Sequence, residues 1–451
     1  MTLVLGMLIE FRIGNYRSYA TEKRFSMVAG SGTELPDNTF KAQGFERHPL
    51  LRSAAIYGAN ASGKSNLIRA AWFVRRFIVR SMEVTQVEGS VRVESFLLDS
   101  TLATKPSEFE ITFLLGGIRH DYGFVVSTKR VHEEWLTVYP KGKPQEWFHR
   151  TVDEQGTSKW SFSRTHLRGG KLQLAGRTLE TALFLSVAAR WNHSQIEPIY
   201  RWFRDRFRVL IQESKLYGRT RQKLLEDPSF KSWATGVLTS ADTGIHRFLV
   251  REREQGKERW SERFFIASEP YASLDNDIEH DLGNFLDDFM VEVRTTHRLP
   301  GTTMEVEWDI DLESNGTQMM LQLLGPIYEA LQVGGVLFID ELDTSLHPHL
   351  TRQLVRLFHD PESNPKGAQL IFTTHDTSLL DPTLFRRDQI WFTAKDASGA
   401  TDLYSLDDYK PRKDEAIQKG YLAGRYGAVP ILERFESAVS ARKPDKTAGD
   451  G

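Results

Sequence analysis

Residues 58–65 read Gly-Ala-Asn-Ala-Ser-Gly-Lys-Ser and fit the phosphate-binding pattern G-x-x-x-x-G-K-[ST] at every fixed position. Residues 53–57 before them have the character of a short buried strand, and residues 66–73 after them have that of a starting helix. A strand, a glycine-rich turn and a helix N-terminus together expose backbone N–H groups that bind phosphate oxygens. A chance glycine turn is the alternative, but the flanking elements favour a nucleotide site.

Within this loop, we expect the Lys64 ammonium to reach the β and γ phosphates and the Ser65 hydroxyl to bind Mg²⁺. The residues of this stretch that we predict to contact the nucleotide are Gly58, Asn60, Ser62, Gly63, Lys64, Ser65 and Asn66.

The composition narrows the class of protein. The chain has 451 residues, of which 40% are hydrophobic and 26% charged, as in a globular protein of two to three domains. The formal net charge of −2 selects neither nucleic acid nor membrane. The absence of cysteine excludes disulfides and thiolate metal sites and suits a reducing cytoplasm, where we expect the protein. No apolar run is long enough to predict a transmembrane helix.

Strands surround the phosphate loop in the sequence. Residues 8–30 alternate as strands around Arg17, which could touch a nucleotide or nucleic acid but is more simply a solvated strand end. Residues 109–126 form a hairpin signature centred on Gly116 and Gly117, and strands continue to residue 150. We therefore expect a substantial antiparallel layer beside the P-loop strand.

Residues 178–263 have a helical pattern. Residues 190–264 carry 16 Lys or Arg against 10 Asp or Glu, interleaved with aromatic residues. This stretch is either a basic, aromatic surface for nucleic acid or a partner, or a set of amphipathic helices with buried aromatics, which we favour slightly.

Residues 269–313 carry 13 Asp or Glu against two Arg. Metal ligands could be proposed among Asp275, Asp277, Glu279, Asp281, Asp287 and Asp288. Their spacing does not match a calcium-binding loop, so we interpret the stretch as an acidic helix surface that leads into a strand at residues 304–310.

A second acidic element follows a strand of four apolar residues, 336–339. Such a run is typical of a parallel strand buried on both faces, and ligands lie at the carboxyl ends of such strands. Asp340 would bind Mg²⁺ or its waters, and Glu341 would polarise the water that attacks the γ-phosphate.

Two further stretches complete the predicted site. The buried strand 369–373 leads to His375, a residue that could serve structure alone or hold the attacking water. Residues 313–318 precede a helix over 319–331, and small residues at a helix N-terminus leave N–H groups open to an anion. With only one P-loop lysine, this second element must serve the same nucleotide or one held by another copy.

These motifs resemble the ATP-binding cassette ATPases in their SMC/RecF-like branch. Residues 58–65 match the Walker A motif, 336–341 Walker B, 314–318 the cassette signature, 342–348 the D-loop, and His375 the switch histidine. Residues 8–18, 106–126 and 421–430 are similar to prokaryotic "AAA" ATPases that accompany anti-phage effectors and are related to the overcoming-lysogenization-defect proteins. The signature departs from Leu-Ser-Gly-Gly-Gln, and no convincing Q-loop glutamine appears.

The resemblance implies an α/β P-loop NTPase fold of the ABC-ATPase type, with mixed parallel and antiparallel sheets and a helical insert. It divides the chain into a first part of the ATPase head (1–177), a helical lobe (178–300), a second part of the head (301–435) and a tail (436–451). It also implies nucleotide contacts from Ser314, Asn315, Gly316, Gln318 and Asp343.

The function implied by the resemblance is an ATPase that forms a head-to-tail dimer, with ATP on one P-loop capped by Ser314 and Gly316 of the other subunit. We expect an ATP- and Mg²⁺-dependent switch that acts with a separate effector, a nuclease or toxin, in anti-phage defence. The alternative is a RecF-like DNA-binding ATPase in repair, so DNA or RNA remains a candidate partner. A nuclease domain after the ATPase and a transporter cassette fit the sequence poorly.

Overall fold

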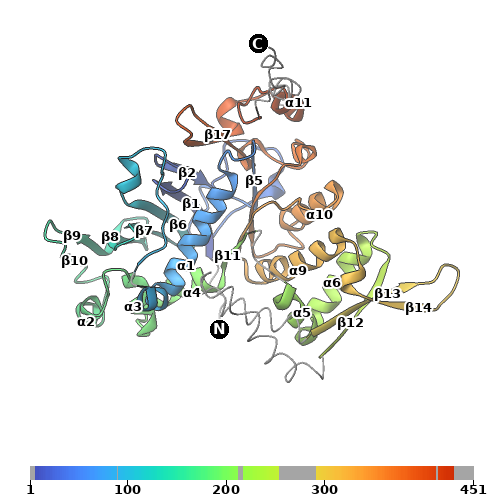
Figure 1. Cartoon of the computed structure of the whole chain (residues 1–451), viewed down its shortest axis with the longest axis horizontal. Coiled ribbons are helices and arrows are strands. Elements are labelled where there is room, and N and C mark those ends of the chain that lie inside the picture. Colours follow the sequence, from blue (N-terminus) through green and yellow to red (C-terminus); the bar gives the residue numbers. More distant parts are fainter. Residues whose placement is uncertain (1–5, 89, 212–216, 253–290, 413–414, 431–451) are drawn as a thin grey trace, which may run out of the picture.

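The computed structural model describes residues 6–88, 90–211, 217–252, 291–412 and 415–430. Within them, the long helix α1 (Lys64–Glu88) packs between two large β-sheets (Figure 1). Some residues considered above lie outside the described part: residues 253–264 of the basic stretch, the tail 436–451, and the acidic series Asp275, Asp277, Glu279, Asp281, Asp287 and Asp288.

The first sheet has seven antiparallel strands in the order β10-β9-β8-β7-β6-β1-β2. Their bounds are Gly6–Gly14 (β1), Lys23–Ser26 (β2), Ser107–Leu115 (β6), Ile118–Val126 (β7), Val131–Tyr139 (β8), Gln145–Val152 (β9) and Ser158–Phe162 (β10). The predicted hairpin is confirmed, since Leu115 pairs with Ile118 across Gly116 and Gly117. Both glycines have positive φ, at 61° and 76°, as a two-residue hairpin turn requires.

The second sheet has six strands in the order β11-β15-β16-β5-β17-β18, all parallel except β18. Their bounds are Ser53–Gly58 (β5), Phe207–Leu210 (β11), Val336–Ile339 (β15), Gln369–Thr373 (β16), Ile390–Lys395 (β17) and Thr401–Ser405 (β18). Because these strands run the same way, the ends of β5, β15 and β16 meet at one edge of the sheet, where the predicted site residues follow.

Alternate residues of the central strands pack into two separate cores. In β5, Ala54 and Ile56 face α1 and the antiparallel sheet, whereas Ala55 and Tyr57 face α9 (Asn315–Val333) and α10 (Pro348–His359). Because both faces of these strands are covered, their residues are mostly apolar and the few polar ones, such as Gln369 and Thr373, are buried. The predicted α/β fold with mixed parallel and antiparallel sheets is confirmed.

Most of the remaining elements lie in the sequence between β5 and β15 of the central sheet. The helices are α2 (Lys171–Gly176), α3 (Phe184–Arg190), α4 (Glu197–Asp205), α5 (Tyr217–Glu226), α6 (Pro228–Ser240) and α11 (Ile417–Leu422). A small antiparallel sheet consists of β12 (Ile245–Glu252), β13 (Val291–Arg298) and β14 (Glu305–Asp309), and β3 (Thr39–Phe40) pairs with β4 (Leu50–Leu51). Among the described helices, none has the length and apolar character needed to cross a lipid bilayer.

The stretch predicted as a helical lobe contains α3 to α6, but also strands that its pattern did not indicate. Strand β11 joins the central sheet by parallel pairing with β15. The neighbouring aromatic residues Trp202, Phe203 and Phe207 are fully buried, which bears out the amphipathic interpretation at these positions. Trp191, in contrast, is 54% exposed.

Candidate nucleotide site

The phosphate loop connects β5 to the N-terminus of α1. Gly63 has φ of +112°, and a Cβ there would lie 2.2 Å from Thr401 Oγ1, so only glycine fits. Lys64 Nζ donates to the carbonyl oxygens of Gly58 and Ala59 at 2.9 and 3.1 Å. The lysine therefore folds back over the loop whose N–H groups would cradle phosphate.

A network of hydroxyl groups supports this loop from outside. Thr401 Oγ1 donates to the Ser62 carbonyl oxygen at 2.8 Å and lies 2.7 Å from Ser18 Oγ. Asn66 Nδ2 also donates to Ser18 Oγ, at 2.8 Å, and the Ser62 hydroxyl lies 2.6 Å from Thr393 Oγ1. Ser62 and Asn66, predicted as nucleotide contacts, are thus partly engaged in holding the loop.

The acidic pair lies at the carboxyl end of β15, beside the end of β16. Thr373 Oγ1 donates to Asp340 Oδ1 at 2.6 Å and accepts from the Glu341 N–H at 2.7 Å. Glu341 has φ of +54°, a left-handed conformation that is uncommon for a residue with a side chain. One threonine therefore fixes both the Asp340 carboxylate and the backbone turn that carries Glu341.

The charged groups of the predicted site influence one another across this edge. Burial lowers the pKa of Lys64, an effect opposed by the negative charges of Glu341, Asp340 and Asp343. Burial, followed by the positive charge of Lys64, lowers the pKa of His375, and the same three carboxylates oppose this shift. The sheet therefore brings together the P-loop lysine, the acidic pair, Asp343 and His375.

Asp343 lies two residues after Glu341, in the segment that follows the acidic pair. Its Oδ2 accepts from the His375 N–H at 3.2 Å. Its Oδ1 is buried and finds no hydrogen-bond partner in the part of the chain that the structure describes. A buried carboxylate oxygen without a donor is costly, and a bound ligand would satisfy it.

The turn that contains Ser314, at the start of α9, is built differently. Ser314 is the N-cap of α9 and its Oγ accepts from the Thr317 N–H at 3.1 Å. Gln318 Nε2 donates to the Glu313 carbonyl oxygen at 2.9 Å, so this side chain closes its own turn. Among the described residues, no hydrogen bond joins residues 314–318 to residues 58–66.

Gly316 instead lies against the segment that follows Walker B. A Cβ on Gly316 would lie 2.7 Å from the Ser345 carbonyl oxygen. Ser345 itself has φ of +61°. The turn that contains Asn315 and Gly316 is therefore packed onto residues 342–348 of the same chain.

The oxygen donors suit a magnesium ion. Mg²⁺ in nucleotide sites takes one or two protein oxygens and fills its octahedron with phosphate oxygens and waters. The Ser65 hydroxyl and the Asp340 carboxylate are such donors. No cluster of three metal-ligating side chains occurs among the described residues.

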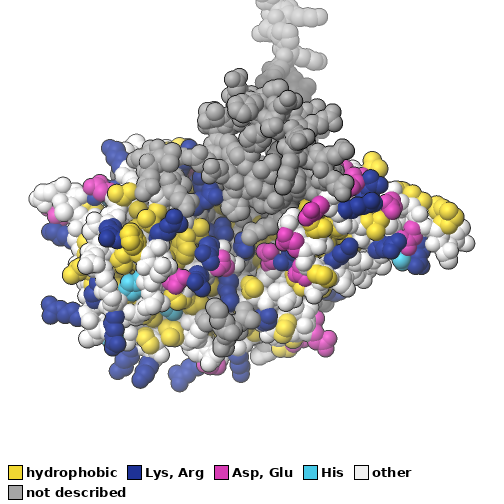
Figure 2. All heavy atoms as spheres, turned by 90° about the horizontal axis from the view of Figure 1, so that it is seen from below, with side chains coloured by type: hydrophobic (Ala, Val, Ile, Leu, Met, Phe, Trp, Pro, Cys, Tyr) yellow, Lys and Arg dark blue, Asp and Glu magenta, His cyan; other side chains and the backbone are white. Residues whose placement is uncertain are grey.

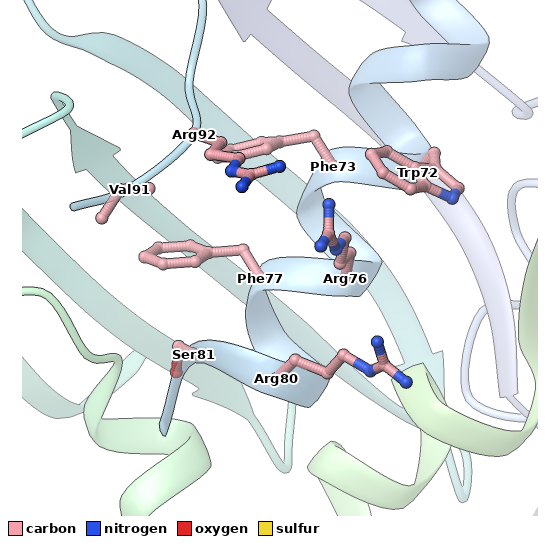
Figure 3. A pocket seen from close by; sticks show the side chains of 8 residues that line it. All are labelled: Trp72, Phe73, Arg76, Phe77, Arg80, Ser81, Val91 and Arg92. Atoms are coloured by element: carbon pink, nitrogen blue, oxygen red, sulfur yellow. The ribbon is translucent and has the colours of Figure 1, made fainter. Parts of the chain in front are cut away.

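Two pockets elsewhere in the described structure do not coincide with these residues. Figure 3 shows the smaller one, of about 40 Å³, on the exposed side of α1 between Trp72, Phe77 and Val91. A second, of about 390 Å³, lies near Arg206, Tyr328 and Gly335, at the opposite end of β15 from Asp340. Neither is lined by the phosphate loop.

Several contacts were not indicated by the sequence. The supporting hydroxyls of Ser18, Thr393 and Thr401 come from segments far from the loop in sequence, and Thr373 carries no motif of its own. Arg17, for which two interpretations were open, pairs with Glu94 at 2.9 Å. Gln86, which lies in a plausible interval of the sequence for a Q-loop but without supporting context, has a side chain outside the described residues.

A glycine-rich loop between a buried parallel strand and a helix, with an acidic pair at the end of another strand of the same sheet, defines a P-loop nucleotide-binding domain. A family model described as "AAA domain, putative AbiEii toxin, Type IV TA system" matches residues 53–381. The chain belongs to this family, whose matched region spans the phosphate loop, the acidic pair and His375.

Comparisons beyond the family model are more distant. The solved "SMC head domain from Thermotoga maritima" is 13% identical, with 88% of this chain and 98% of that chain covered at a TM-score of 0.38. The structure titled "Crystal structure of the SmcHead bound to the C-winged helix domain of ScpA" is 12% identical, with 90% and 100% covered at a TM-score of 0.40. No curated protein sequence matches the chain.

Proposed function

We propose that this protein is an ABC-type ATPase that binds and hydrolyses ATP and works as a dimeric switch. The observation that carries the proposal is the hydroxyl of Thr373, which hydrogen-bonds both Asp340 and the N–H of Glu341. At this edge of the sheet the two carboxylates interact electrostatically with Lys64. This arrangement supplies a phosphate cradle, a cation and an acidic pair, which phosphoryl transfer to water requires.

Each residue then has a defined role. Lys64 and the N–H groups of the loop bind the phosphates, and Glu341 accepts a hydrogen bond from the attacking water. His375, with its pKa lowered, is neutral near pH 7 and can hold a hydrogen bond to the same water or to the γ-phosphate. Ser65 and Asp340 would hold Mg²⁺, which neutralises phosphate charge when bound.

The position of the Ser314 turn supports a dimer. Gly316 packs against Ser345 of its own chain, and among the described residues no hydrogen bond links Ser314, Asn315, Gly316 or Gln318 to the phosphate loop. We propose that they cap the nucleotide held by a second copy, with Asp343 close to the same interface. ATP binding would close the dimer, and hydrolysis would open it.

We further propose that the switch is the sensor or regulator of an anti-phage defence system in the prokaryotic cytoplasm. The family description names a putative toxin and a type IV TA system, which supports action in a system with a partner protein, and the resemblance of residues 8–18, 106–126 and 421–430 to anti-phage ATPases supports a separate effector such as a nuclease or toxin. The open and closed states of the dimer would restrain or release that effector.

The shared site is tested by mixing two inactive variants. Lys64→Ala removes the phosphate-binding cation, and Ser314→Arg blocks the capping turn. A mixed dimer contains one site with intact Lys64 from one chain and intact Ser314 from the other, so mixing should restore part of the ATPase activity.

The control mixes Lys64→Ala with Glu341→Gln. Both residues serve the nucleotide of their own chain, so no intact site forms and activity should stay absent. If mixed dimers of the first pair form and remain inactive, the shared site is wrong, although a P-loop ATPase that acts within one chain would still stand.

A further inference from the structure

A second surface, remote from the phosphate loop, consists of Arg164, Arg168, Arg177, Arg190 and Trp191, and we call it the α2–α3 surface. These residues flank helices α2 and α3, and all five are exposed. Figure 2 shows several Lys and Arg side chains along the lower left of the molecule, on the side where Figure 1 places α2 and α3.

Positive charges outnumber negative charges in this region of the sequence. Residues 158–205 contain eight Lys or Arg but only three Asp or Glu. Those three acids are already paired: Glu197 with Arg201 at 2.5 Å, Asp205 with Arg204 at 2.7 Å, and Glu180 with Arg130 at 3.5 Å. Within the described residues, the four arginines of the α2–α3 surface have no carboxylate partner.

Two hydrogen bonds join the loop that carries Arg164 and Arg168 to the segment that follows Trp191. Gln195 Oε1 accepts from the Arg168 N–H at 2.9 Å, and Gln195 Nε2 donates to the His166 carbonyl oxygen at 2.8 Å. The loop that carries Arg164 and Arg168 is thereby fixed against the turn that follows Arg190 and Trp191. The backbone segments that carry these arginines are therefore held near each other.

Trp191 gives the surface a flat aromatic face. The Arg177 guanidinium lies 4.1 Å from the centre of the Trp191 ring, and the ring remains 54% exposed. Leaving a large apolar ring in water costs free energy that its burial would recover. Trp202, which follows in the next helix, is buried, whereas Trp191 is exposed to solvent.

We propose that the α2–α3 surface binds single-stranded nucleic acid. Its four unpaired arginines match a phosphate backbone, because guanidinium groups donate paired hydrogen bonds to phosphate oxygens. The exposed Trp191 ring, with Arg177 against it, matches an unpaired base, since bases stack on aromatic and guanidinium planes. An acidic protein segment would use the arginines but leave the ring without a planar partner.

This surface lies apart from the nucleotide site, so the inference extends the proposed function and does not depend on it. Binding is measured with the full chain without ATP, by the fluorescence anisotropy of labelled oligo(dT) and oligo(U) of about 20 nucleotides. A titration from about 50 to about 200 mM salt should give a steep loss of affinity, as counterion release predicts.

Two variants separate the contributions of charge and stacking. Arg168→Ala/Arg190→Ala should flatten the dependence of log affinity on log salt by about 1.4, since each lost phosphate contact on a single strand contributes about 0.7. Trp191→Ala should weaken binding about tenfold with little change in that slope. The control is Lys141→Ala/Lys143→Ala, in the exposed turn between β8 and β9 of the antiparallel sheet. It removes two positive charges outside the α2–α3 surface and should leave binding unchanged.

Thermal melting of each variant confirms that the fold is kept, as expected for exposed side chains. The inference is overturned if the wild-type protein does not bind either strand, or if both double variants weaken binding equally. It is also overturned if poly-glutamate binds as tightly as the oligonucleotides and Trp191→Ala has no effect, because the surface would then fit an acidic protein. Stronger binding to oligo(U) than to oligo(dT), or the reverse, identifies RNA or DNA as the source.

Discussion

Thr373 Oγ1 donates a hydrogen bond of 2.6 Å to Asp340 Oδ1, and this contact joins the ends of two adjacent parallel strands. Both residues are buried, so the carboxylate has one fixed orientation toward the sheet edge. The same hydroxyl accepts from the N–H of the next residue, Glu341. A single side chain thus positions the proposed metal ligand and the proposed catalytic glutamate.

Thr373→Val should therefore lower the rate of ATP hydrolysis by about 10- to 100-fold, the range found when a group that orients a metal ligand is lost. Valine keeps the shape but offers no hydrogen bond. ATP binding without Mg²⁺ should change little, because Lys64 and the loop are untouched. Steady-state hydrolysis and nucleotide titration with and without Mg²⁺ measure the two effects separately.

Thr351→Val is the matched control for that variant. Thr351 is equally buried, but its hydroxyl has no hydrogen-bond partner among the described residues. Replacing an unsatisfied buried hydroxyl by a methyl group should be neutral or stabilising, and hydrolysis should stay at the wild-type rate. If both variants lose the same fraction of the hydrolysis rate, Thr373 does not position Asp340 and Glu341 for catalysis.

Thr401→Val should weaken ATP binding about tenfold, because it removes the donor to the Ser62 carbonyl oxygen and one neighbour of Ser18. The loop would lose its support while Lys64 and Ser65 stay in place. Thr401→Ser keeps the hydroxyl and should bind ATP as the wild type does. An affinity unchanged by valine would show that the loop holds its shape without this contact.

His359 gives a prediction for stability against pH. Burial, with the positive charges of Arg52 and Arg356, lowers the pKa of His359 to about 3, well below its ordinary value of 6.5. As the pH falls below 6.5, the unfolded chain takes up a proton that the folded chain refuses, so folding stability is lost. This one group should cost about 2 kcal/mol between about pH 7 and about pH 5.

His359→Gln removes that titration and retains a group able to bond the Ser53 hydroxyl, which lies 2.7 Å from His359 Nε2. Urea unfolding at the two pH values measures the loss. The variant should lose about 2 kcal/mol less than the wild type over this range, whatever its stability at pH 7. Identical pH dependence in the two proteins would contradict a neutral, buried His359.

The sequence predicts the parts of the site that depend on local order along the chain. The phosphate loop, the strand before Asp340 and the helix after Ser314 follow from glycine placement, apolar runs and capping, all of which act over a few residues. Long-range contacts are different. Ser18 and Thr401 are 383 positions apart, and only the completed sheets bring them to the loop.

Strand β11 is an element of the fold that the local sequence pattern does not predict. Phe207–Leu210 follows a helix directly and carries an arginine, so its pattern merges with that of the helical stretch around it. Its strand conformation comes from pairing with β15, more than a hundred residues later, which no local pattern encodes. Trp202 and Trp191 likewise share a sequence context and differ only in what packs on them.

The most direct test of the shared site is the mass of Glu341→Gln in solution, with and without ATP and Mg²⁺, by light scattering. This variant should bind ATP without hydrolysing it, so the closed state should accumulate. Without ATP, we expect a mass close to that of one chain, 51.6 kDa. With ATP and Mg²⁺, we expect about twice that value. A protein that has ATP bound and still has the mass of one chain would contradict it.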